Sequence, residues 1–494
     1  MKTLKALSLS LLAAVALSGT ASAVTPTIVH ITGSTAFRSQ AVAGMIDYLS
    51  QGGTVAVHAG FTSGSTLLKA GQQILANGTI ATDGSGTATQ VVECYWSGSV
   101  AGAVDLAIGN PTGVYYDVNS IGAANITAVN GSTVTVNNGT NTTVYGGGVA
   151  LTSPGTTTLA AEGAFVDHNI SWASKALTGA TIGSPGSING YSSIGAIQTA
   201  LGSSTIIDSG SASDPGGSSG SNAHTDGTVG VVTFEWVLGN INSSGLSAIG
   251  TTITNITQEG VKGLISNGYV AQSFLTGTNN AADSANYFYL TGRNEDSGTR
   301  VNAFLEGQLP VTVNPKQYSV TGTTLALFPA NSALNTEPLL SWPTIGHSGY
   351  SSGGNVATAL SGATNGTWTF TNGKATNNSG SAFVIGYLGA TDAVTAITAG
   401  ATALTYDGVP YSVAAIQNGQ YPFWGYEHLY RLSGEAAALG TIIDGIADKI
   451  HDTDADVASN GKHSVLSGDV ASGILYDANF NVYKTTEGQP ASHF

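Results

Sequence analysis

The chain has 494 residues, 9% of them charged, and a formal net charge of −15 at pH 7. The sequence has no basic patch that could neutralise the phosphates of a nucleic acid backbone, which excludes nucleic acid as a partner. The length corresponds to about two to four domains. The one cysteine, Cys94, cannot form an intrachain disulfide, and its apolar neighbours predict a buried strand thiol.

Residues 1–23 have the pattern of a secretory signal peptide. Lys2 and Lys5 precede an apolar run, and small residues follow it up to Ala23, where we expect cleavage. No cysteine follows the run, which excludes lipid attachment of the bacterial lipoprotein kind. No later stretch approaches the ~20 consecutive apolar residues of a membrane span. We therefore expect a periplasmic or secreted protein with no membrane span in the mature chain.

Three strand–turn–helix units share hydroxyl residues at their junctions. The β-branched run 27–32 is followed by Gly-Ser-Thr and by apolar residues at helical spacing, which predicts a strand and a helix that begins at Ser34 and Thr35. VVECYW and SGSVAGAVDLAIG predict a second unit with Ser99 at the helix start, and YFYL and TGRNEDSGTRVNAFLEG predict a third. In open α/β sheets, ligands bind where strand ends and helix N-termini converge.

The third unit places an arginine four residues ahead of a Ser-Gly-Thr turn. Arg293 offers a planar fork of donors that matches the oxygens of an oxyanion. Ser297, Gly298 and Thr299 add hydroxyls and the free N–H groups of a helix start. The alternative is that Asp296 or Ser297 caps the helix and that Arg293 is solvated. These residues alone leave both interpretations open.

The segments between and after these units predict loops, an insertion and further α/β elements. Residues 115–160, in which Thr and Val alternate and Asn-Gly recurs, predict a small β-hairpin insertion, and residues 203–227 predict a flexible loop. The later predictions, in chain order, are an apolar strand at 229–240, a helix at 257–268, a glycine turn and helix at 349–361, a buried strand at 381–389, and an aromatic strand at 421–432 followed by a helix.

The order of these motifs resembles the phosphate-binding proteins of ABC phosphate importers, within the type II periplasmic substrate-binding proteins. ITGSTAFR, YWSGSVAG and RNEDSGTR are similar to three turns of that family, and VGVVTFEWVLGN looks like its strand between lobes. AFVIGYLG and GQYPFWGYEHLY resemble its return and closing strands. The matches run in order from about Ile31 to about Leu432. The resemblance implies a two-lobed α/β clamp with Gly/Thr/Asn-rich β insertions.

The resemblance also implies how the chain is divided and what it binds. Lobe I would comprise residues 24–230, with the insertion and the loop named above, together with residues 387–494, and lobe II would comprise residues 231–386. Inorganic phosphate or a related oxyanion would lie in the cleft between the lobes. An ABC permease would be the further partner.

Carried over by position, the resemblance assigns ligand-binding roles to residues of both lobes. From lobe I these are Ser34, Thr35 and Ser99, with Ser97 as the weaker alternative to Ser99, and from lobe II they are Arg293, Ser297, Gly298 and Thr299. Arg38 and Arg300 are either further cleft residues or solvated residues at helix starts.

The family also has an aspartate in the cleft. Phosphate keeps a proton near neutral pH, so a carboxylate can accept a hydrogen bond from it, whereas sulfate has no proton to give. The equivalent position is Asp167 if the strand is EGAFVDHN, and Asn110 if the strand is VDLAIGN. We favour Asp167, because too few residues separate Ser99 from Asn110 for a helix and a strand.

Other functions find less support in the sequence. The nine histidines are scattered without ligand spacing, and residues 451–462 lack the glycine at position six of a calcium loop. We therefore expect no enzyme activity, no metal and no cofactor. The alternative function is that of a secreted surface, structural or adhesive protein that retains a binding-protein fold, because fold does not determine function.

Overall fold

The computed structural model describes most of the predicted elements. The described residues are 27–38, 41, 44–45, 48–49, 55–59, 73–82, 86–110, 113–116, 134–138, 141–145, 149–150, 156–182, 186–209, 228–239, 253–278, 280–321, 324–329, 340–341, 348–362, 369–371, 382–451, 482–485 and 487–493. The predicted signal peptide and most of the predicted loops at 203–227 and 451–462 lie outside them.

Lobe I is built on strands whose carboxyl ends meet at one edge of a sheet. β1 (Thr27–Gly33) pairs in parallel with β4 (Gly86–Tyr95) on one side and with β10 (Gly163–Val166) on the other. Residues 29–33 of β1 are all buried, as is typical of a parallel strand covered on both faces. Cys94 of β4 is also buried, which confirms the predicted strand thiol.

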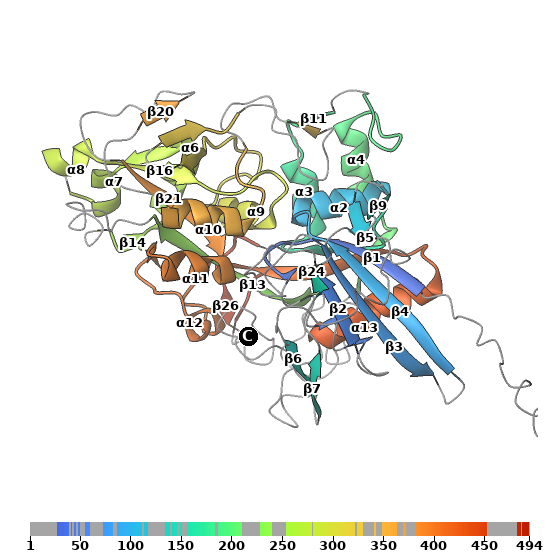
Figure 1. Ribbon diagram of the computed structural model, residues 1–494. Coiled ribbons are helices and arrows are strands. Elements are labelled where there is room, and N and C mark those ends of the chain that lie inside the picture. Colours follow the sequence, from blue (N-terminus) through green and yellow to red (C-terminus); the bar gives the residue numbers. More distant parts are fainter. Residues whose placement is uncertain are drawn as a thin grey trace, which may run out of the picture.

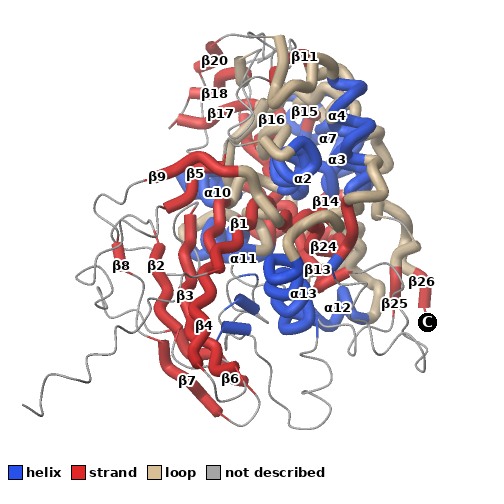
Figure 2. The backbone as a smooth tube through the Cα atoms, turned by 90° about the vertical axis from the view of Figure 1, so that its right-hand side faces the viewer, coloured by secondary structure: helices blue, strands red, loops and turns tan. Residues whose placement is uncertain are grey.

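Helices cover both faces of this sheet. α2 (Ser99–Ile108) packs on β1 and β10 and is joined by α3 (Ile170–Ala176) and α4 (Ile194–Leu201), whereas α13 (Ala437–His451) packs on β1 from the opposite side (Figure 2). Beyond β4 the sheet continues through the antiparallel strands β3 (Gln73–Thr82) and β2 (Val55–Ala59).

Lobe II has its own sheet with helices on both faces. β16 (Tyr287–Thr291) pairs in parallel with β21 (Ala382–Gly389), and β15 (Tyr269–Ala271) forms the edge (Figure 1). Because side chains alternate along a strand, Val384 packs with α10 (Gly353–Gly362) and α11 (Ala390–Thr398), while Phe383 and Ile385 pack with α6 (Gln258–Asn267) and α9 (Gly298–Glu306); these apolar residues form two core clusters.

One strand passes from lobe to lobe. In β13 (Thr228–Leu238), the first half pairs with β24 (Trp424–Leu432) and the second half pairs with β21 of lobe II. β24 also pairs with β10, so a continuous sheet runs through both lobes. The structure thus shows the predicted two-lobed α/β architecture. Since α11 packs on α10 and β21, we propose that the chain returns to lobe I after residue 398 rather than at 387.

The predicted hairpin insertion is confirmed, but the loop prediction at 203–227 is wrong at its start. β6 (Val134–Asn138) and β7 (Asn141–Tyr145) form an antiparallel pair within the insertion. Ile206–Asp208 form β12, which pairs with β24. The loop was predicted from the Gly- and Ser-rich residues that follow, although the two isoleucines before them extend the sheet of lobe I.

Short elements complete the fold. They are β5 (Gly113–Tyr116), β8 (Val149–Ala150), β9 (Thr156–Leu159), β11 (Thr181–Ile182), β14 (Asn255–Ile256), α7 (Gln272–Thr276), α8 (Ala281–Ala285), β17 (Tyr318–Thr321), β18 (Thr324–Leu327), β19 (Leu340–Ser341), β20 (Thr369–Thr371), β22 (Thr402–Ala403), β23 (Thr405–Tyr406) and α12 (Val413–Gln417). Within the described residues, no helix has the length and apolarity required to cross a membrane.

A hairpin of residues 482–493, here called the C-terminal hairpin, was not predicted. β25 (Val482–Tyr483) pairs with β26 (Ser492–His493). The buried Lys484 donates from Nζ to the carbonyl of Trp424 (2.8 Å) and lies 3.5 Å from Oε2 of Glu306 on α9. It therefore attaches to lobe II and to the beginning of β24.

The same hairpin also attaches to lobe I. Glu487 accepts hydrogen bonds from the backbone N–H of Asn169 (2.8 Å) and from Nε1 of Trp172 (3.1 Å), where α3 begins. The C-terminal hairpin thus contacts both lobes next to the strands that connect them.

Candidate functional site

The ends of four strands converge where the lobes meet. β1 is parallel to β4 and β10, so the residues that follow these strands lie at one edge of the lobe I sheet. The loop between β16 and α9 of lobe II reaches the same edge (Figure 1). All the predicted ligand-binding residues are brought together here and are buried, namely Ser34, Thr35, Ser99, Asp167, Arg293, Ser297, Gly298 and Thr299.

Two of the candidate hydroxyls of lobe I are used inside that lobe. Oγ of Ser34 accepts from the backbone N–H of Phe37 (3.0 Å), as a helix-capping residue does. Oγ of Ser97 lies 2.8 Å from Oγ1 of Thr32. Ser99 instead connects two junctions, because its Oγ accepts from the backbone N–H of Asp167 (3.2 Å).

Arg293 is the link between the lobes. Its Nη1 donates to Oγ1 of Thr35 (3.1 Å) in lobe I, while Nε and Nη2 donate to the carbonyls of Tyr350 (3.2 Å) and Ser351 (3.0 Å) in lobe II. A guanidinium has five N–H donors. Within the described residues, the other two N–H groups have no partner. The solvated alternative for Arg293 is wrong, because the residue is 2% exposed.

The charge of Arg293 is buried with no ion-pair partner in the part of the chain that the structure describes. No carboxylate of the described residues lies within 4.0 Å of its guanidinium; the charges of Asp392 and Asp167 act from further away. Burial lowers the pKa of Arg293, and these aspartates oppose that effect. Burying a cation without a close counter-charge costs several kcal/mol, by order of magnitude. An anion held at this place would offset that cost.

The loop that follows Arg293 packs directly onto lobe I. The backbone N–H of Val100, in the first turn of α2, donates to the carbonyl of Asp296 (2.9 Å). Gly98 has a positive φ of 107°, and a Cβ at this position would collide with the same carbonyl. A Cβ on Gly298 would lie 2.5 Å from Oγ of Ser99 and 2.7 Å from Oδ2 of Asp167. Glycine is therefore required on both sides of the contact.

Ser297 caps α9, and Thr299 does not. Oγ of Ser297 accepts from the backbone N–H of Arg300 (3.4 Å), so the capping interpretation is correct for this serine. Thr299 is 1% exposed and lies in the first turn of α9.

Asp167 directly follows β10, at the same edge as Ser34 and Ser99. Its carbonyl accepts from Nδ2 of Asn302 on α9 (2.8 Å), a further contact between the lobes. Its Oδ1 is buried without a hydrogen-bond partner in the described part of the chain. Asn110 lies elsewhere, because VDLAIGN belongs to α2 and not to a strand. Asn110 follows the C-terminal end of that helix, whereas Ser99 begins it, and its Nδ2 lies 3.4 Å from Oδ1 of Asp105.

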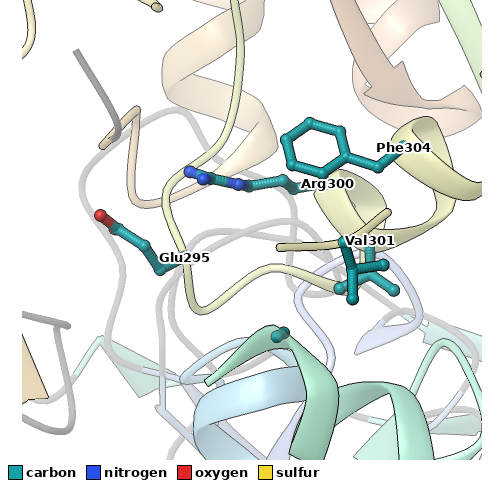
Figure 3. A pocket seen from close by; sticks show the side chains of 6 residues that line it. Glu295, Arg300, Val301 and Phe304 are labelled. Carbon is teal, nitrogen blue, oxygen red and sulfur yellow. The ribbon is translucent and has the colours of Figure 1, made fainter. Parts of the chain in front are cut away.

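A small pocket adjoins the loop on the α9 side. Arg300 and Glu295 line it with Phe304, and α3 of lobe I contributes Ala176 (Figure 3). Its volume of about 10 Å³ is room for about one water molecule. Arg300 is buried, and its guanidinium carbon lies 5.2 Å from the centre of the Phe304 ring. Arg300 is thus packed beside the loop and is not solvated.

A buried charged network lies near Asp167. Nδ1 of His428 is 2.6 Å from Oδ2 of Asp208, and its Nε2 is 3.8 Å from Oε1 of Glu487. Burial lowers the pKa of His428, but Asp208 and Glu487 outweigh it and raise the pKa to about 10. Burial raises the pKa of Glu487, but His428 and the N–H of Asn169 lower it to about 2. The network ties the C-terminal hairpin to the end of β10.

Several residues around the site carry no sequence signal. The carbonyls of Tyr350 and Ser351 hold Arg293, but any residue type could supply them. Glu427 and His428 lie in an aromatic strand that reads as core. The only sequence signal for a functional role was the presence of two ionisable residues inside an aromatic strand. The sequence does not indicate which strand pairs with that strand.

Solved structures of phosphate-binding proteins are similar to this one. A protein from Clostridium perfringens, described as a phosphate ABC transporter substrate-binding protein and solved with bound phosphate, has 11% identity and a TM-score of 0.37 over 89% of this chain and 98% of that chain. An ABC-type phosphate transport receptor from Vibrio cholerae has 10% identity and a TM-score of 0.35, covering 88% and 99%.

A third structure, PstS from Borrelia burgdorferi, has 11% identity and a TM-score of 0.31, covering 88% of this chain and 97% of that chain. No protein-family model and no curated protein sequence matches the chain.

Proposed function

We propose that this protein binds phosphate, or a related oxyanion, between its lobes outside the cytoplasm. The observation that supports this most is the buried guanidinium of Arg293, which has N–H groups without partners and no carboxylate within ion-pair distance among the described residues. Three helix or turn starts with hydroxyl residues surround it. A fixed cation with neutral donors is the arrangement that oxyanions prefer.

Each candidate residue has a role in this proposal. Arg293 and Thr299 donate from lobe II, and Thr35 and Ser99 donate from lobe I. Gly298 contributes a backbone N–H group at the start of α9. Ser34 and Ser297 support the helix starts, because their own N–H groups donate to the carbonyls of Phe165 (2.8 Å) and Asn294 (3.3 Å). Asp167 accepts the hydrogen bond of the proton on phosphate. The hydrogen bond between Arg293 and Thr35 joins the lobes, so the ligand would enter by separating this pair. Delivery to an ABC permease is the use that we propose for the bound ligand.

The direct test is calorimetric titration of the mature protein with phosphate, with sulfate and with chloride as the blank. We expect saturable binding of phosphate at a stoichiometry of about one, as for a single cleft. Absence of heat with both oxyanions at millimolar concentration, in a folded sample, would overturn the proposal and favour the surface-protein alternative.

The first prediction concerns Arg293→Met. Loss of a charged hydrogen-bond donor should weaken phosphate binding by about 1.5–3 kcal/mol, or roughly tenfold to more than a hundredfold. Thermal unfolding followed by circular dichroism verifies that the variant is folded. Lys262→Met, which removes a half-buried positive charge of α6 paired with Glu259, is the matched control and should bind as the wild type does. Equal affinities in the Arg293 variant and the wild type would exclude Arg293 as a ligand.

A further inference from the structure

Asp167 has a second carboxyl group beside it. β10 and β24 are antiparallel, with Gly163 opposite Arg431 and Val166 opposite His428. One further residue in this register brings Asp167 opposite Glu427. Residues opposite each other in an antiparallel pair project to the same face, with Cβ atoms about 4.5–5.5 Å apart.

Both carboxyl groups are buried and incompletely satisfied. Glu427 is 0% exposed and Asp167 is 1% exposed. Oε1 and Oε2 of Glu427 and Oδ1 of Asp167 have no hydrogen-bond partner among the described residues. Burial raises the pKa of Glu427 well above its ordinary value, and the carboxylates of Asp167 and Asp208 raise it further. Two neighbouring buried carboxyl groups cannot both be ionised, so the pair holds one proton.

The surroundings favour Glu427 as the group that holds this proton. Asp167 is close enough to Arg293 for their opposite charges to attract each other. Glu427 instead faces the negative charges of Asp167 and Asp208. Oδ2 of Asp167 lies next to Gly298, at the start of α9. A donor from Glu427 is therefore best directed at Oδ1, the oxygen without a partner.

We propose that protonated Glu427 donates to Oδ1 of Asp167 and thereby keeps Asp167 an acceptor for the bound oxyanion. Glu427 is then a positioning residue that sets ligand specificity without touching the ligand. The choice of oxyanion rests on the proposed function above, whereas the location of the proton does not.

The chemical consequence concerns protonated and unprotonated ligands. If Glu427 supplies the shared proton, Asp167 has only acceptor oxygens for the ligand, so it favours phosphate that carries a proton and disfavours sulfate. Without that donor, Asp167 is a buried carboxylate next to an apolar group and takes up a proton itself. A protonated Asp167 can donate to either anion. Discrimination between phosphate and sulfate should then be lost.

The binding test compares two substitutions that differ in their ability to donate. In Glu427→Gln the amide still donates to Asp167, and the ratio of the phosphate and sulfate dissociation constants should stay within about twofold of the wild type. In Glu427→Met, which has similar size and no donor, that ratio should fall by about tenfold or more. Glu235→Met on β13, which removes another buried carboxyl group, is the matched control and should leave the ratio unchanged.

The proton itself is tested by infrared spectroscopy on the protein without ligand. At about pH 9, the carboxyl groups of Glu235 and Glu435, with pKa values raised to about 7, have lost most of their protons. Burial also raises the pKa of Glu295 and of Glu306, but these groups are common to both proteins and cancel in the difference spectrum. We expect a protonated-carboxyl C=O band in the wild type that is absent from Glu427→Gln. An unchanged band would overturn the proposal, as would equal ratios in the Gln and Met variants. If neither anion binds but the band disappears, the proposed function fails and the proton assignment stands.

Discussion

Ser297 and Arg293 lie four residues apart and differ in what their side chains do. The serine is a helix cap, as its position predicts, and its hydroxyl is occupied by the N–H of Arg300. The arginine turns back across the junction to Thr35. The two interpretations of this segment were therefore not exclusive. A cap and a buried cation coexist in one loop, and in the proposed function only the cation contacts the ligand through its side chain.

The second prediction concerns Asp167→Asn. An amide can accept from phosphate and can turn its NH₂ group toward sulfate, so the substitution removes a repulsion against sulfate. We expect the preference for phosphate over sulfate to fall by at least about tenfold, with little loss of phosphate affinity. Competition measurements at fixed pH and salt give the ratio. Asn110→Asp, at the far end of α2, should leave this ratio unaltered. If the ratio changes in the Asn110 variant and not in Asp167→Asn, the assignment of Asp167 as the selective residue is wrong.

The third prediction concerns the pH dependence of stability. His428 has a pKa raised to about 10 from an ordinary 6.5. Its contribution to the free energy of unfolding is therefore complete below about pH 6.5 and is lost as pH rises toward 10. Glu487 has a pKa lowered from 4.5 to about 2. Its contribution to the free energy of unfolding is therefore complete above about pH 4.5 and is lost as pH falls toward 2.

The measurement is denaturant unfolding across this pH range. The wild type should lose on the order of a few kcal/mol between pH 6.5 and 10, and His428→Asn should show a smaller alkaline loss. His30 also contributes to the alkaline loss of stability, because Glu162 and Glu93 raise its pKa to about 9 against the effect of burial. His30→Asn is therefore the control that measures this second contribution. Identical alkaline slopes in the wild type and His428→Asn would contradict the prediction.

The candidate residues could be found from the sequence because hydroxyl residues and glycine recur after apolar strands. Their partners could not be found in this way. Oγ of Ser99 receives the N–H of Asp167, 68 positions further on, and no local pattern records that pairing. Glu427 is likewise a buried carboxyl group only because β24 inserts beside β10.

At the scale of elements, the turn before α2 packs closely against the loop before α9. Gly98 makes this possible, because its backbone has a φ of 107° and the carbonyl of Asp296 lies where a Cβ would be. An alanine at this position must change both the turn and the contact between the lobes.

The fourth prediction is that Gly98→Ala weakens phosphate binding by about tenfold or more, since backbone strain of about 1–3 kcal/mol falls on the turn that carries Ser99. Gly186→Ala is the matched control, because Gly186 has a φ of 87° and open space around it. Both variants carry the cost of a positive φ, but only the first meets Asp296. Titration calorimetry separates the two; equal affinities would show that the contact is dispensable for binding.

Elements with strong apolar periodicity were predicted from the sequence, and elements held by distant pairing were not. β13, β21 and β24 are long strands rich in apolar and aromatic residues, and the structure confirms them. β12 and the strands of the C-terminal hairpin are only two or three residues long. Such segments become strands only because a neighbouring strand offers hydrogen bonds, and a single sequence does not contain that information.

At the scale of the whole molecule, two lobes face each other across a contact made by Arg293, Asp296 and Gly298. These residues come from lobe II, and their partners come from lobe I. A ligand that touches both sides would favour the closed arrangement by its greater affinity for it.

The fifth prediction follows from this arrangement. Small-angle scattering of the mature protein should give a smaller radius of gyration with saturating phosphate than without it. Arg293→Met should show a smaller change at the same phosphate concentration, because one side of the contact is weakened. A radius that phosphate leaves unchanged in the wild type would count against closure by the ligand.

The position of β24 also constrains the order in which the chain folds. This strand lies between β10 and β13, yet it is synthesised after all of lobe II, and the hydroxyl of Tyr430 meets the N–H of Ile170 across 260 residues. Contacts of such separation slow folding, because the intervening chain must be ordered or looped before they form. Lobe II is contiguous in sequence and can form its sheet early. The sheet of lobe I has an unpaired edge at β10 until β24 has been synthesised. Its exposed strands are therefore the part of the nascent protein most in need of protection from aggregation.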